Sequence, residues 1–175
     1  MFLKTITLSF CVALYFLQCQ GGPPDDVQRN TIGRIVGDLY VPNTPLTYEE
    51  FLTIFNQVKQ ATNAAGELSS LVDLERSIAA STIKVKDAIA CAQSIFGDDE
   101  ATDLVERFCH ENRSRIFGTI EFRQLVDIIH VVKQTMQKDL NIDTAVQIKD
   151  EIIKRMYPCG SYSDTVTTII ENLEF

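Results

Sequence analysis

The chain has 175 residues, of which 45% are hydrophobic and none is tryptophan, and it carries a formal net charge of −8 at pH 7. This length is enough for one domain with a hydrophobic core of its own. The acidic balance makes nucleic acids and anionic membrane surfaces poor partners, because like charges repel each other.

The beginning of the chain predicts a secretory signal. Lys4 supplies a basic start, and the apolar run that follows is too short to span a bilayer. Cleavage between Cys19 and Gly22 would divide the chain into a signal peptide, residues 1–21, and a single helical domain, residues 22–175. We therefore expect a secreted, extracellular protein. No later apolar stretch approaches the roughly 20 residues of a spanning helix, so we expect no membrane insertion.

Apolar residues that recur at steps of three and four predict about seven helices, and no stretch shows sustained alternation. In chain order, the helical patterns cover 27–39, 47–58, 68–74, 81–95, 98–108, 120–140 and 143–156, with a short one at the C-terminus. Thr47 and Glu50 form a capping-box pattern, and Asp98 and Asp143 precede two further helices as caps. The expected fold is an all-α, single-domain bundle, with paired helix-loop-helix units as one arrangement.

Three cysteines would be exposed to an oxidising compartment once Cys11 and Cys19 leave with the signal. Cys109 lies near a helix end and Cys159 in a loop, so we predict a disulfide between them. Cys91 lies on an apolar helix face, where we predict a free thiol. The other two pairings within the chain, and a cross-link between two copies through the odd cysteine, stay open as alternatives.

Asn112 opens the one N-glycosylation sequon of the chain, with Arg113 and Ser114 after it. The sequon lies in a polar stretch between two predicted helices, so we expect a glycan there in a eukaryotic host. Such a glycan would keep the surrounding surface out of an interface.

No catalytic pattern stands out, and we predict that the protein is not an enzyme and needs no cofactor. His110 and His130 are the two histidines. His130 lies in an apolar helical segment, which favours a structural role, and side chains of adjacent helical residues such as Cys109 and His110 point about 100° apart. The chain has no G-x-S-x-G, H-E-x-x-H or C-x-x-C pattern and no phosphate-binding glycine loop.

The segment 47–52 resembles the loop end and exit helix of an EF-hand. If Leu46 takes the eighth loop position, Ile83 and Ile120 follow at equal steps of 37 residues, and Gly118 matches the loop glycine. This spacing is similar to that of calmodulin-like tandem EF-hands, and the resemblance implies paired helix-loop-helix units over about 27–132.

The calcium ligands of that family are mostly absent here. The second and third candidate loops begin with 76–78 and 113–115, where arginine, serine and isoleucine stand in place of oxygen-rich ligands. The chain therefore departs from the resemblance at the positions that bind the metal.

A separate weak metal candidate presents side-chain oxygens at the first, third, fifth and twelfth positions of a loop-like stretch. Its residues are Asp139, Asn141, Asp143 and Asp150. Because Thr144 replaces the turn glycine, helix capping is the favoured interpretation, and we favour no metal site.

The leading hypothesis for function is a binding module in which paired amphipathic helices enclose an apolar groove for a protein or peptide partner. One alternative is an extracellular carrier of a small apolar ligand, held in a cavity between helices. A second alternative is a weakly calcium-responsive module built on the four polar residues just named.

Overall fold

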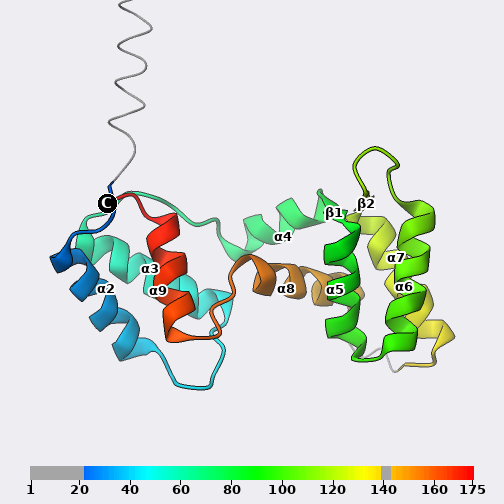
Figure 1. Ribbon diagram of the computed structural model, residues 1–175, viewed down its shortest axis with the longest axis horizontal. Helices are drawn as coiled ribbons and strands as arrows, with labels where there is room; N and C mark the ends of the chain where they lie inside the picture. The colour runs from blue at the N-terminus through cyan, green and yellow to red at the C-terminus, as the bar shows by residue number, and fades with distance from the viewer. Residues whose placement is uncertain (1–21, 139–142) are drawn as a thin grey trace, which may run out of the picture. The chain divides into compact units, whose positions relative to one another are not determined.

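The computed structural model describes residues 22–138 and 143–175. Within them the chain forms eight helices and two short strands (Figure 1). Their order is α2 (Asp26–Leu39), α3 (Tyr48–Thr62), α4 (Leu71–Ala79), β1 (Thr82–Lys84), α5 (Val85–Phe96), α6 (Asp99–Asn112), β2 (Thr119–Glu121), α7 (Phe122–Thr135), α8 (Thr144–Met156) and α9 (Tyr162–Asn172). The predicted all-α class is confirmed. The predicted signal and the candidate ligands Asp139 and Asn141 lie outside the described residues.

The helices fall into two compact units, whereas the sequence predicted one domain. Unit 1 contains residues 22–68 and 158–175, and unit 2 contains residues 69–157. The chain leaves unit 1 after α3 and returns to it only with α9. Local patterns do not reveal this division, because it depends on which helices pack together across long stretches of sequence.

Unit 1 is built from α2, α3 and α9, and α2 packs against both of the others (Figure 1). Its core consists of fully buried apolar side chains: Ile32, Val36, Phe55, Val58 and Ile169. Ala65 and Glu174 exchange two backbone hydrogen bonds, 2.8 and 3.1 Å long, and so join the end of the chain to the segment after α3. These contacts build unit 1 from two segments that are far apart in the sequence.

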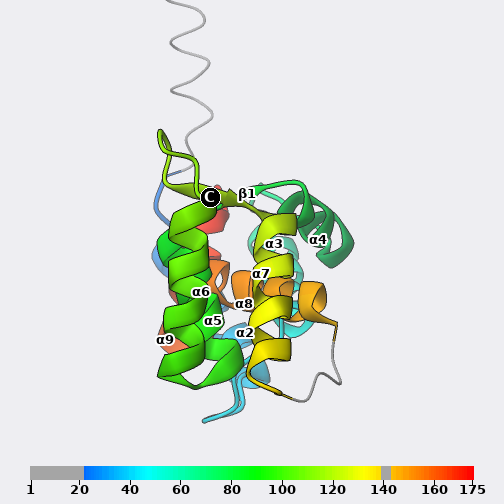
Figure 2. The same cartoon turned by 90° about the vertical axis from the view of Figure 1, so that its right-hand side faces the viewer.

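Unit 2 contains two helix-strand-helix arrangements, α4–β1–α5 and α6–β2–α7 (Figure 2). β1 and β2 pair antiparallel, with Ile83 directly opposite Ile120, and both side chains are buried. The helices expected from residues 81 and 120 therefore begin later, at Val85 and Phe122. Three-residue strands are too short for alternation to reveal them, and their pairing joins distant parts of the chain.

Several predicted helix ends are confirmed. The Asp98 side chain accepts a hydrogen bond from the Ala101 amide at 3.2 Å, and Gly97 ends α5 in the left-handed region with φ of 58°. The helix predicted to reach residue 140 instead ends at Thr135, followed by Gln137 with φ of 50°. Capping by nearby residues thus sets most helix boundaries. The exceptions are the two helix starts displaced by the strands and the early end of α7.

Candidate functional site

The predicted disulfide between Cys109 and Cys159 is absent from the structure. Cys91, Cys109 and Cys159 are all free and buried. Cys109 is buried in α6 of unit 2, whereas Cys159 belongs to unit 1 and is buried in the loop between α8 and α9, as the sequence predicted for its loop position. Burial raises the pKa of both thiols to about 11, and it also raises the pKa of Cys91. Protonated, buried thiols are poor nucleophiles at neutral pH.

Asn112, the predicted glycosylation residue, is the last residue of α6 and is exposed. Its Nδ2 donates a hydrogen bond of 2.8 Å to the backbone oxygen of Phe108. The sequon therefore lies at the surface, where the helix gives way to the loop before β2.

The remaining candidate ligands behave as helix residues. Asp143 caps α8, with its Oδ1 accepting from the Ala145 amide at 2.8 Å and the Val146 amide at 3.4 Å. Asp150 is exposed on α8. Among the described residues, no three His, Cys, Asp or Glu side chains gather in an arrangement that could hold a metal ion.

Both histidines are exposed and make only local contacts. His110 lies 3.3 Å from Glu106 and 2.8 Å from Arg113, and His130 lies 2.9 Å from Gln134. Each of these contacts joins residues three or four positions apart. His110 points to solvent while the adjacent Cys109 is buried, so the two do not form a nucleophile and base pair.

The helices of unit 2 enclose α8, which packs against α4, α5 and α7. Ile148 is fully buried and Ile153 is 5% exposed, so the apolar face of α8 turns inward. The surface on which an amphipathic helix could lie in this unit is therefore occupied by a helix of the same chain.

Polar contacts surround this packed helix. Lys149 of α8 lies 3.4 Å from Glu75 of α4, and the Ser94 hydroxyl donates to Glu151 at 2.5 Å. Arg155 donates to a backbone oxygen of α5 at 2.6 Å. Buried Lys133 of α7 donates to the Gln147 side chain, and desolvation lowers the pKa of this lysine. These contacts come from all three neighbouring helices and hold α8 in one register.

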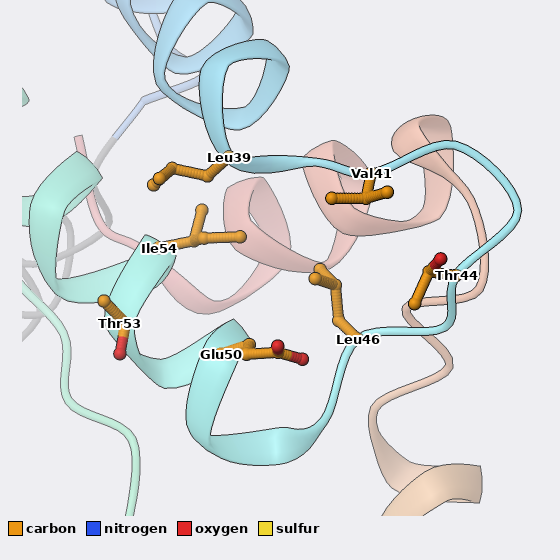
Figure 3. Close-up of a pocket in the computed structure, with 7 residues that line it drawn as sticks. All are labelled: Leu39, Val41, Thr44, Leu46, Glu50, Thr53 and Ile54. Atoms are coloured by element: carbon orange, nitrogen blue, oxygen red, sulfur yellow. The ribbon is translucent and has the colours of Figure 1, made fainter.

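A small pocket opens on unit 1, between the linker that joins α2 to α3 and the first turns of α3 (Figure 3). Its volume is about 260 Å³, and we call it the linker pocket. It is lined by Leu39, Val41, Thr44, Leu46, Glu50, Thr53 and Ile54. Figure 3 shows that its apolar side chains come from the end of α2, from the linker and from α3.

The linker pocket combines exposed apolar surface with a carboxylate. Leu39 is 40% exposed and Val41 is 58% exposed, so solvent reaches apolar atoms at its mouth. Glu50 accepts hydrogen bonds from the Thr47 amide at 2.8 Å and the Thr47 hydroxyl at 2.9 Å. The hydrogen bond from the Thr47 amide, and secondly the one from the Thr47 hydroxyl, lower the pKa of Glu50. The carboxylate is therefore ionised at neutral pH.

Sequence reasoning did not identify the linker pocket, although it recognised its parts. Thr47 with Glu50 indicated the start of α3, and Pro42 and Pro45 stand in the connection before it, where proline favours extended backbone. The sequence did not predict the path of the linker, which brings Val41 and Leu46 into one pocket with side chains of α3. The available signal was the pair of apolar residues, Val41 and Leu46, that stand next to the two prolines between the helices.

Within 22–138 and 143–175, the structure contains no helix with the length and apolar character to cross a membrane. Comparison with known proteins found no matching family model, no matching curated protein and no matching solved structure.

Proposed function

We propose that the chain is a secreted, non-enzymatic binding module whose linker pocket receives an apolar segment of a protein or peptide partner. The observation that carries this proposal is that two partly exposed apolar side chains, Leu39 and Val41, line the same pocket as the ionised Glu50. Exposed apolar surface with a polar rim is typical of protein interaction sites.

The size of the linker pocket favours a side chain or short segment over a small-molecule ligand. Pockets that enclose such ligands usually span about 300–1,000 Å³ and bury most of the ligand surface. The linker pocket holds about 260 Å³ and is open to solvent. The carrier of a small apolar ligand is therefore the alternative, not the leading proposal.

The leading sequence hypothesis placed the partner in a groove between paired helices. In unit 2 that location is taken by α8, with Ile148 fully buried against its neighbours. We therefore assign partner binding to unit 1, where apolar atoms are accessible. The relationship to EF-hand proteins stays a proposal, supported by the equal steps of 37 residues from Leu46 to Ile83 and from Ile83 to Ile120, and by the pairing of Ile83 with Ile120.

The test is a selection of peptides of about 12 residues from a random display library on the purified chain. We expect enriched peptides to carry an apolar residue and to bind Val41→Arg at least about tenfold more weakly than the wild type. The matched control is Val72→Arg, which alters a 63% exposed valine of unit 2 and should bind the peptides normally.

Equal binding of the enriched peptides to Val41→Arg would exclude the linker pocket as the binding site. Native mass spectra with and without calcium address the alternatives. A retained lipid would favour the carrier, and a calcium-dependent mass shift would favour the calcium-responsive module.

A further inference from the structure

The loop between α6 and β2, residues 113–118, presents two adjacent apolar side chains to solvent. Ile116 is 84% exposed and Phe117 is 75% exposed, the highest values among large apolar side chains of the described residues. Single exposed apolar residues are normal, but an aromatic and a branched side chain exposed together at a loop tip place a larger apolar area in water, which is unfavourable. Their position suggests a contact made with another molecule.

Hydrogen bonds within the chain hold this loop in a tight turn. The Ser114 amide donates to the Thr119 oxygen at 2.8 Å, and the Gly118 amide donates to the Ser114 oxygen at 2.9 Å. The Phe117 amide also lies 3.4 Å from the Ser114 hydroxyl. Gly118 has φ of 61°, a conformation that glycine adopts without strain. A loop ordered in this way loses little conformational entropy on binding.

The loop is also a local concentration of positive charge on an acidic chain. Arg113 and Arg115 are both exposed, and residues 113–118 contain no acidic side chain. The whole chain carries a net charge of −8. A complementary surface would therefore be concave and apolar, with a carboxylate at its edge, and the linker pocket has these properties.

We propose that the 113–118 loop of one copy of this chain inserts Ile116 and Phe117 into the linker pocket of a second copy. Arg113 or Arg115 then pairs with Glu50, whose carboxylate has acceptor capacity beyond its two bonds to Thr47. This inference rests on the proposed function, because it names the occupant of the same pocket.

Such a contact joins two different surfaces, so it is heterologous. A pair of copies keeps one unused loop, on the copy whose pocket is filled, and one unused pocket, on the copy whose loop is inserted, so further copies add in the same way. We therefore expect a series of dimers, trimers and longer assemblies that grows with concentration. A closed, symmetric dimer is not the expected product.

The experiment is sedimentation of the secreted chain over a range of concentrations, after any glycan at Asn112 has been trimmed enzymatically. We expect association only of copies without this glycan, because a glycan at Asn112 would keep the neighbouring loop out of an interface. We expect the average mass of the wild type to rise with concentration. Phe117→Ser removes the aromatic side chain that enters the pocket. Val41→Arg places a positive charge in the pocket, which repels the arginines of the loop. Each variant should associate at least about tenfold more weakly than the wild type.

Mixing the two variants gives the decisive measurement. Phe117→Ser keeps an intact pocket and Val41→Arg keeps an intact loop, so an equal mixture should form dimers with one copy of each and nothing longer. The control Val72→Arg should associate as the wild type does. Dimers in the mixture that are absent from either variant alone would show that loop and pocket meet directly.

Three results would overturn the inference: a wild type that stays monomeric up to about 1 mM, normal association of Phe117→Ser, or a mixture that forms no dimers. If the chain stays monomeric while selected peptides still require Val41, the proposed function holds and only the second copy is excluded. If neither association nor peptide binding depends on Val41, both proposals fail.

Discussion

At the scale of single residues, the start of α3 is governed by a reciprocal pair of hydrogen bonds. The Glu50 amide donates to the Thr47 hydroxyl oxygen at 3.3 Å, while the Glu50 carboxylate accepts from the Thr47 amide at 2.8 Å. Because the two residues are three positions apart, the sequence alone predicted this capping box. The same carboxylate lines the linker pocket, so one residue serves both the helix start and the candidate site.

We expect Thr47→Ala to lower the free energy of unfolding by about 1 kcal/mol, as is typical for loss of an N-cap side chain. The pKa of Glu50 is held low by its bonds to Thr47, so its stabilising effect is present at neutral pH and is lost as the pH falls through that lowered pKa. Denaturant unfolding at neutral pH and near pH 3 measures both effects.

The matched variants for this prediction are Glu50→Gln and Glu49→Gln. The difference in the free energy of unfolding between the wild type and Glu50→Gln should become smaller at acidic pH. Glu49 is exposed and lies outside the capping box, so its variant should show a weaker pH dependence. The same pH dependence in both variants would contradict the role given to the bonds with Thr47.

At the scale of elements, the burial of α8 depends on the helices that surround it. Its own sequence shows an Asp143 cap and an amphipathic pattern, both predicted. The pattern does not say which helices cover its apolar face. In the structure that face packs against α4, α5 and α7, with polar contacts to each of them.

We expect Ile148→Ala to lower the free energy of unfolding by about 2–5 kcal/mol, because this side chain is fully buried and its loss leaves a cavity. Val146→Ala, on the same helix but 39% exposed, should cost about 0.5 kcal/mol. Urea unfolding of the two variants is the measurement. Equal costs would contradict the burial of α8 in unit 2.

At the scale of the whole molecule, two separate cores stabilise the chain. Phe55 is fully buried in unit 1 and Ile129 is fully buried in unit 2. The units are discontinuous in sequence, because α9 returns to pack on α2. Separate cores allow each unit to open locally without the other.

We expect Phe55→Ala to cost unit 1 about 3–5 kcal/mol and to speed amide hydrogen exchange in α2, α3 and α9. Exchange in α5, α6 and α7 should stay close to that of the wild type. Ile129→Ala should produce the reverse pattern. Uniform acceleration along the chain in either variant would mean that the two cores unfold as one.

The sequence by itself determined the all-α class and most helix starts, because these depend on residues three or four positions apart. Thr47, Asp98 and Asp143 cap the helices they were expected to cap. One part of the linker pocket was predicted too, since Glu50 belongs to the expected capping box.

Only the tertiary structure decided which elements meet. It paired Ile83 with Ile120, placed Cys109 and Cys159 in different units, packed α8 against three helices of unit 2 and brought linker residues next to side chains of α3. Each of these outcomes depends on contacts between residues far apart in sequence, or on which of several apolar faces pack together. Periodicity identifies the faces that need burial, but packing between distant segments selects the partner of each face.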